Sequence, residues 1–132
     1  MSKSKQLDVG NSTEEIICNY FSQKGYWAFI IPKKAGGQPF DLIACKGNDT
    51  WFVDAKHVEM KKASFEFSRI EPNQRTAMER AVGKGKIKNV GFFIFWERTP
   101  DKLYFFPFRM WKTLEDSGCK SVKMVDMICI QL

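Results

Sequence analysis

Two charged residues stand inside a stretch that otherwise has the composition of a buried β-strand, Trp-Phe-Val-Asp-Ala-Lys-His-Val at residues 51–58. Alternate side chains of a strand point to the same face, so Asp54 and Lys56 would lie about 6 to 7 Å apart on one face together with Phe52. A buried charge is costly unless something binds it. The segment therefore favours a polar site built on a sheet, and the alternative is a surface salt bridge on a solvated strand.

A second carboxylate is expected close to this pair. The residues on either side of the turn at 47–49 have strand composition, which predicts a β-hairpin. Counting back from the turn places Asp41 opposite Ala55, within one residue, so that Asp41 and Asp54 converge. Two carboxylates make a hard-oxygen site suited to Mg²⁺, and an adjacent lysine can hold a phosphate or help to position and deprotonate a water molecule. These groups are the minimum for phosphodiester hydrolysis.

Helical and strand patterns alternate along the chain, which predicts a mixed α/β fold with a central sheet flanked by helices. A first helix is expected from the capping residues at 11–13 to the stop at Gly25, and a second from Pro72 to about Val82. Residues 1–9 are expected to form a flexible basic tail, and residues 10–132 a single domain. The further expected elements are strands at 26–31, 89–96, 103–106 and 122–130 and a short helix at 109–116.

Composition narrows the possible function classes. The chain of 132 residues is long enough for one core but too short for two. Its 21 Lys and Arg against 15 Asp and Glu give a net charge of +6, which favours a polyanionic partner such as DNA. No apolar run approaches the ~20 residues of a membrane helix and no export signal is visible, so a cytoplasmic protein with no membrane partner is expected. The four cysteines lack the spacing of a zinc site.

Five features follow one another between about residues 10 and 108. They are Gly10 four residues before Glu14, the stretch at 24–28, Pro39-Phe40-Asp41, Asp54-Ala55-Lys56 thirteen residues after Asp41, and residues 63–67 followed by Gln74. Their order and spacing resemble those of the PD-(D/E)XK nucleases, and within them the Holliday-junction resolvases of the archaeal Hjc and bacterial RecU types. Three features differ: Phe40 separates the proline from the aspartate, Asp54 replaces the usual glutamate, and a short loop at 32–39 replaces the long stalk of the RecU type.

The resemblance implies a restriction-endonuclease-like core and Mg²⁺-dependent hydrolysis of DNA, with Mn²⁺ as a possible substitute. Glu14, Asp41 and Asp54 would hold the metal, with Glu15 as the alternative helix ligand. Lys56 would orient the attacking water, and Gln74 would assist it. Because a resolvase cuts two strands symmetrically, the resemblance also implies a homodimer, for which the apolar strands at 89–96 and 122–130 offer candidate surfaces.

Two pairs of lysines flank the expected site and are predicted to contact DNA phosphates: Lys33 with Lys34, and Lys61 with Lys62. His57 is expected to face away from the metal and to be structural. The favoured function is a Holliday-junction resolvase acting on branched DNA. The alternatives are a nuclease of the same superfamily that cuts another DNA structure or a single strand, and a non-catalytic DNA-binding module that keeps the fold.

Overall fold

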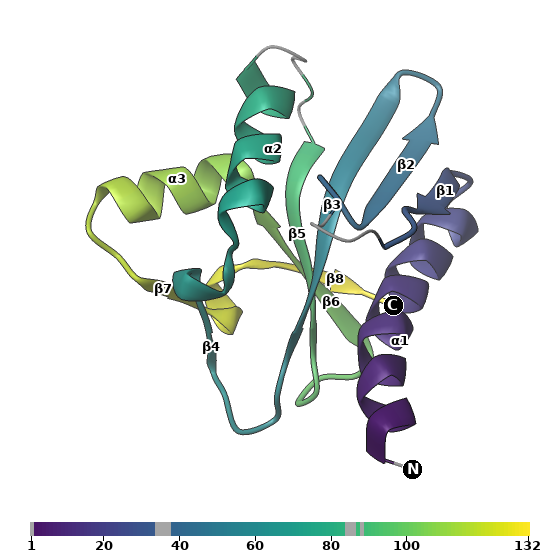
Figure 1. Cartoon of the computed structure of the whole chain (residues 1–132), viewed down its shortest axis with the longest axis horizontal. Coiled ribbons are helices and arrows are strands. Elements are labelled where there is room, and N and C mark those ends of the chain that lie inside the picture. The colour runs from purple at the N-terminus through teal and green to yellow at the C-terminus, as the bar shows by residue number, and fades with distance from the viewer. Residues whose placement is uncertain (1, 34–37, 84–86, 88) are drawn as a thin grey trace.

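The computed structural model describes residues 2–33, 38–83, 87 and 89–132. A six-stranded sheet forms its centre (Figure 1), and its strands are, in spatial order, β1 (Trp27–Ile30), β2 (Leu42–Lys46), β3 (Asp49–Val58), β5 (Asn89–Trp96), β6 (Lys102–Pro107) and β8 (Ile128–Gln131). Neighbouring strands run antiparallel, except that β3 and β5 pair in parallel. The predicted hairpin is therefore confirmed as β2–β3, and the sheet is mixed as expected.

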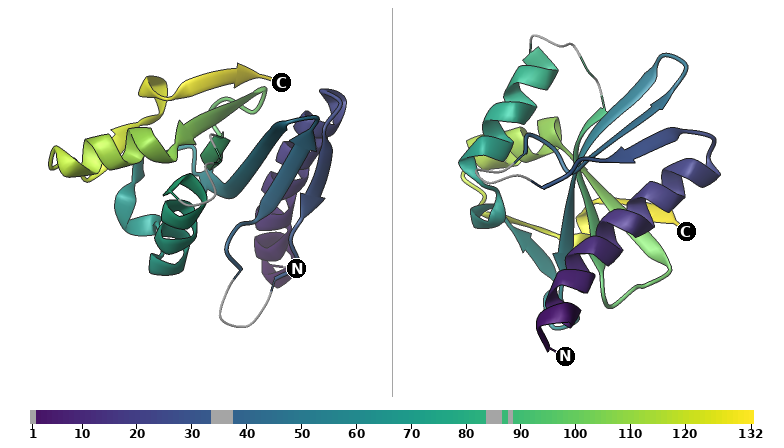
Figure 2. Two further views of the ribbon diagram at one scale, coloured as in Figure 1. Left: turned by 90° about the horizontal axis from the view of Figure 1, so that it is seen from above. Right: turned by 45° about the vertical axis from the view of Figure 1, so that its right-hand side comes forward.

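Helices cover both faces of the sheet, and they are α1 (Ser2–Gln23), α2 (Pro72–Gly83) and α3 (Phe108–Asp116). Figure 2 shows α1 on one face and the other two helices on the opposite face. Ile17 and Phe21 of α1 are buried against their face of the sheet, whereas Met78 of α2 and Trp111 of α3 are buried against the other. This three-layer arrangement is the predicted mixed α/β fold class.

The central strand β3 sends alternate side chains into the two layers, as its sequence predicts. Val53 is fully buried in the layer beneath α1, where Trp51 and Ala55 also pack. Phe52 and Val58 join the layer of α2 and α3. Asp54 and Lys56 share the parity of Phe52, so they point into the α2 side of the sheet.

The first helix begins earlier than the capping residues predict. It starts at Ser2 and continues through the residues expected to cap it at 11–13, so the backbone of residues 2–9, expected as a flexible tail, is helical. Lys and Gln in that segment are good helix formers and no proline interrupts it. Asn, Ser and Thr are strong capping residues, but each costs less than about 0.7 kcal/mol inside a helix, so they do not have to end one. The division of the chain into a tail and a single domain stays a prediction.

The apolar stretch at 122–130 is not one strand, contrary to the prediction. It divides into β7 (Ser121–Lys123), a 3₁₀ turn η2 (Met124–Asp126) and β8. β7 pairs with β4 (Ser64–Glu66), a short strand that the sequence did not reveal, in a second two-stranded sheet. The division arises because Met124 and Met127 are both buried, a spacing of three residues that a continuous strand cannot place on one face.

Strand β5 is not available as a dimer surface, in contrast to the expectation for residues 89–96. It lies between β3 and β6, and Phe92, Phe93 and Ile94 are completely buried from both faces. Large apolar side chains are exposed elsewhere, with Trp27 stacked on Phe29 along the edge strand β1.

Within the described part of the chain, no helix is long and apolar enough to cross a lipid bilayer.

Candidate active site

The β2–β3 hairpin brings the two predicted aspartates together. Leu42 pairs with Val53, so the register continues with Asp41 opposite Asp54, one residue from the predicted pairing with Ala55. The backbone N–H of Asp41 donates to the carbonyl of Val53 at 3.1 Å, and the N–H of Ala55 donates to Asp41 Oδ2 at 2.8 Å. The backbone and the side chain of Asp41 are thus both hydrogen-bonded to β3, which fixes its carboxylate beside Asp54.

Asp54 is the most deeply buried acid of the site, with 1% of its surface exposed. Its Oδ2 atom has no hydrogen-bond partner among the described residues. Burial, and then the nearby charge of Asp41, raise the pKa of Asp54 well above its ordinary value, although the charge of Lys56 opposes the rise. A buried carboxylate oxygen without a partner is costly, and a bound cation would satisfy it.

Lys56 is held by the segment that leads into α2. Its Nζ donates to Gln74 Oε1 at 3.1 Å and to the carbonyl of Arg69 at 3.2 Å. The same Gln74 oxygen accepts the N–H of Glu71 at 3.0 Å, so the amide is itself oriented by the start of the helix. Burial lowers the pKa of Lys56, and the charge of Asp54 opposes this effect. Gln74 therefore lies at the site, where it contacts Lys56.

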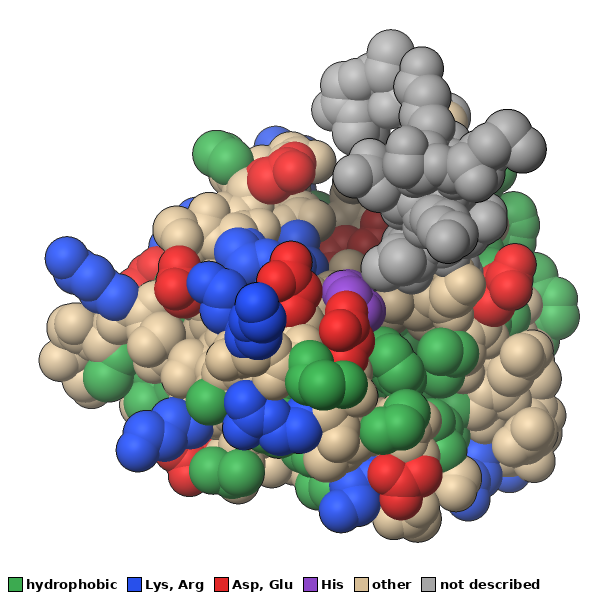
Figure 3. Space-filling model, turned by 90° about the horizontal axis from the view of Figure 1, so that it is seen from below, with side chains coloured by type: hydrophobic (Ala, Val, Ile, Leu, Met, Phe, Trp, Pro, Cys, Tyr) green, Lys and Arg blue, Asp and Glu red, His purple; other side chains and the backbone are tan. Residues whose placement is uncertain are grey.

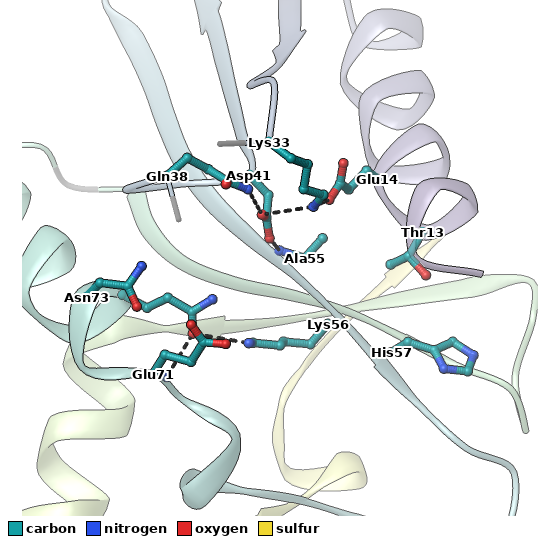
Figure 4. Close-up of a pocket in the computed structure, with 11 residues that line it drawn as sticks. Thr13, Glu14, Lys33, Gln38, Asp41, Ala55, Lys56, His57, Glu71 and Asn73 are labelled. Carbon is teal, nitrogen blue, oxygen red and sulfur yellow. Dashed lines mark hydrogen bonds and ion pairs between the residues drawn. The ribbon is translucent and has the colours of Figure 1, made fainter. Parts of the chain in front are cut away.

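Helix α1 supplies the third predicted carboxylate. Glu14 is buried and lines a pocket of about 400 Å³ together with Asp41 and Lys56, whereas Glu15 is exposed. The choice between the two glutamates is thus decided by the helix phase, which turns only Glu14 towards the sheet. Figure 4 shows Glu14 and Asp41 approaching one another across the pocket, with Lys56 extending to the other side.

Lys33 occupies the space between two of the three carboxylates. Its Nζ lies 2.5 Å from Glu14 Oε2 and 3.7 Å from Asp41 Oδ1. Burial by itself lowers the pKa of Lys33, but the hydrogen bond to Glu14 and the charge of Asp41 outweigh burial and raise it. The structure places the Lys33 ammonium between these two carboxylates, while 60% of its side chain is exposed. Its contact with DNA stays a prediction.

The other predicted lysines lie apart from this pocket. Lys61 and Lys62 are exposed, and Lys62 lines a neighbouring pocket of about 300 Å³ with Arg69. Lys34 lies outside the described residues. His57 points away from Lys56, stacks on Phe95 and pairs with Glu97 at 2.9 Å, and it also lines both pockets. The structural role expected of it stays a prediction.

Sequence reasoning missed several polar residues of the pocket. Gln38 donates its amide to Asp41 Oδ1 at 2.9 Å, and Glu71 and Asn73 line the rim where α2 begins. In the space-filling view, acidic side chains are recessed in a hollow and Lys and Arg side chains gather beside it (Figure 3). The proximity of Gln38 to Asp41 in the chain was an available signal, whereas Glu71 could be placed only by the packing of α2.

The donor set suits a hard divalent cation, although the side chains as placed do not form a finished site. Glu14 of α1 and Asp41, the residue before β2, line the pocket with carboxylate oxygens. Asp54 of β3 does not line it, but it lies beside Asp41, and its partnerless Oδ2 supplies a reason for a cation to bind. Within the described residues, no three Asp, Glu, His or Cys side chains lie close enough to chelate an ion as they stand. The Lys33 ammonium lies between Glu14 and Asp41, in the space that an ion shared by these two carboxylates would occupy.

The buried position of Asp54 predicts how the stability of the metal-free protein depends on pH. Its raised pKa means that the folded state keeps a proton that the unfolded chain releases above the ordinary value of 3.8. The free energy of unfolding is therefore expected to fall as pH rises from that value towards the folded-state pKa. Urea denaturation in EDTA, compared between the wild type and Asp54→Asn from about pH 4 to pH 8, should show a difference that grows with pH. A difference that is constant with pH would contradict this prediction.

Comparison with known proteins adds one finding on the fold. No family model matches the sequence, and no curated protein matches it. Among solved structures, the chain is similar to Archaeoglobus fulgidus Hjc, a Holliday junction resolvase from an archaeal hyperthermophile, with a TM-score of 0.57. The match covers 76% of this chain and 74% of that chain at 16% sequence identity. This chain shares the fold of that resolvase. The restriction-endonuclease-like architecture expected from the sequence is thereby confirmed.

Proposed function

We propose that the protein is a metal-dependent DNA endonuclease of the PD-(D/E)XK type that resolves branched DNA such as a Holliday junction. The observation that carries this proposal is the pairing of Asp41 with Asp54 across a hairpin of this fold, with Lys56 two residues further along β3. A buried acid with a partnerless oxygen is an expensive feature, and a half-buried lysine with a lowered pKa adds to the cost. A catalytic site explains why the protein keeps these two residues despite the free energy that their burial costs.

Glu14, Asp41 and Asp54 would hold Mg²⁺, or Mn²⁺ in its place. A metal bound there lowers the pKa of a coordinated water and neutralises the charge that develops on the phosphate. The chain's own contribution is to hold the acids in position: Ala55 and Gln38 bind the two oxygens of Asp41, at 2.8 Å and 2.9 Å respectively. These bonds keep one lone pair of each oxygen occupied and the carboxylate plane fixed.

Lys56 would act on the water and the scissile phosphate. Its lowered pKa makes its proton easier to release than that of an exposed lysine, and its charge can stabilise the phosphate while it is protonated. Gln74 and the carbonyl of Arg69 hold the ammonium at one end of the pocket. We therefore assign Gln74 to the positioning of Lys56.

DNA would be bound mainly through its backbone. Lys61 and Lys62 are exposed in the segment after β3, and Lys62 lines the second pocket, so both could contact phosphates without reading sequence. Lys33 would contribute from its place between Glu14 and Asp41. Lys34 lies outside the described residues and is proposed as a phosphate contact from the sequence alone. Symmetric cutting of a junction needs two active sites, so we propose that the protein works as a homodimer.

Another structure-specific nuclease is the second candidate function. The segment 32–39, between β1 and β2, is short, and the RecU-type resolvases that the sequence resembles carry a long stalk at this place. A non-catalytic DNA-binding module is the third candidate, and the retention of Asp41, Asp54 and Lys56 together opposes it.

Cleavage of end-labelled DNA tests the proposal directly. Purified protein is incubated with a four-way junction, a flap, a linear duplex and a single strand, each with Mg²⁺ and with EDTA. We expect paired cuts at symmetric positions in the junction, dependent on Mg²⁺, with the other substrates cut at least about tenfold more slowly, a discrimination of roughly 1.4 kcal/mol. Preferential cutting of flaps or single strands would transfer the assignment to the second candidate, and junction binding without any cutting would favour the third.

A further inference from the structure

Among the described residues of the pocket, the Lys33 ammonium lies where it conflicts with metal binding. Its ammonium is 2.5 Å from Glu14 Oε2, closer than the 3.7 Å that separates it from Asp41 Oδ1. Mg²⁺ binds carboxylate oxygens at about 2.0–2.1 Å. An ion held by Glu14 and Asp41 would therefore lie within a few ångströms of the ammonium, where two positive charges repel strongly.

The two carboxylates need a counter-ion in any state of the protein. Glu14 and Asp41 are 5% and 9% exposed, and Asp54 lies beside Asp41 with its partnerless oxygen. Burying several acids together is unfavourable unless a cation compensates them. Lys33 provides that compensation with a single side chain that contacts both Glu14 and Asp41.

The two lysines of the pocket differ in how easily they can leave it. The side chain of Lys33 is 60% exposed, so its ammonium has a path to solvent. Lys56 is instead half-buried, and its ammonium donates to Gln74 Oε1 and to the carbonyl of Arg69. Asp41 stays in place without Lys33, because Ala55 and Gln38 still bind its oxygens. A change of cation can therefore occur at Lys33 while the rest of the site stays fixed.

We propose that Lys33 is an exchangeable counter-ion of the metal site. Its ammonium neutralises Glu14 and Asp41 until a divalent cation binds, and the cation displaces it from both carboxylates. The affinity for metal is then set by competition with this side chain. The released ammonium remains tethered at the rim of the pocket, where it can contact a DNA phosphate. This inference rests on the proposed function, since it assumes that Glu14 and Asp41 bind a divalent cation.

Metal affinity measured without DNA tests the exchange. Isothermal titration calorimetry with Mg²⁺ and with Mn²⁺ compares the wild type with Lys33→Gln, and Lys123→Gln serves as the matched control because Lys123 is an exposed lysine in β7. Removing the competitor should tighten binding of both ions by about three- to tenfold in Lys33→Gln, the value of one ordinary intramolecular hydrogen bond, because the Lys33 side chain is largely exposed. The control should bind the ions as the wild type does.

The NMR signal of the Lys33 side-chain ammonium gives a second readout. It requires no DNA cleavage, and a variant is needed only to assign the signal. In ¹H–¹⁵N spectra of lysine ammonium groups, the Lys33 signal should change on saturation of the wild type with Mg²⁺, while the Lys123 signal should not. The proposal that Lys33 exchanges with the metal is wrong if Lys33→Gln binds the ions no more tightly than the wild type does. It is also wrong if Lys123→Gln tightens binding equally. In both cases the metal site itself still stands. If neither the wild type nor Lys33→Gln binds either ion, the proposed function fails together with the exchange.

Discussion

Replacing Asp54 with asparagine is expected to abolish Mg²⁺-dependent cleavage and at the same time to stabilise the metal-free protein. Asparagine keeps the shape of the side chain but removes the negative charge that would bind the metal. Metal stabilisation of a phosphoryl transition state is worth several kcal/mol, and ~1.4 kcal/mol changes a rate tenfold, so cleavage should fall by about a thousandfold or more. The free energy of unfolding in EDTA at pH 8 should rise by about 1 kcal/mol, because a buried amide costs less than a buried ionised carboxylate.

The opposite signs of these two effects make the prediction specific. Single-turnover cleavage of the preferred DNA substrate measures the first effect, and urea denaturation in EDTA measures the second. Asp126→Asn is the matched control, since Asp126 is exposed in the 3₁₀ turn η2 far along the chain from the pocket, and it should change neither quantity. A variant that loses activity because it has lost stability would show that Asp54 serves the fold rather than the site.

Replacing Gly91 with alanine is expected to cause the largest loss of stability in the central sheet. Gly91 lies in β5 opposite Pro107 of β6. An added Cβ would lie 2.4 Å from the carbonyl oxygen of Phe106 and 2.8 Å from Cα of Pro107. Both contacts are with backbone atoms that cannot move aside without separating the two strands. The free energy of unfolding should fall by about 3 kcal/mol, the upper part of the range for overpacked cores.

Gly83→Ala provides the matched control for this prediction. Gly83 is the last residue of α2, and a Cβ there meets no atom within 4 Å. The substitution should leave the free energy of unfolding unchanged or raise it by up to about 1 kcal/mol, because alanine favours helix more than glycine does. Urea denaturation of both variants measures the difference. Equal stability of the two variants would mean that β5 and β6 do not pair as closely as described.

The chemistry of the site follows from the sequence through local rules. A two-residue period placed Asp54 and Lys56 on one face of β3, and the hairpin turn brought Asp41 to within one residue of its position. The clear apolar runs located β1, β3, β5 and β6, and Pro72 located the start of α2. Such features are legible because strand alternation, turns and helix starts depend on neighbours that are close in the chain.

Long-range packing decided the rest. The phase of α1 against the sheet selects Glu14 over Glu15, and the burial of both Met124 and Met127 divides the last apolar stretch into β7, η2 and β8. The sequence by itself determined which groups could act together, namely two aspartates and a lysine on a hairpin. Only the tertiary structure decided that Lys33 stands between Glu14 and Asp41, because that contact joins segments 19 residues apart through the docking of a helix on a sheet.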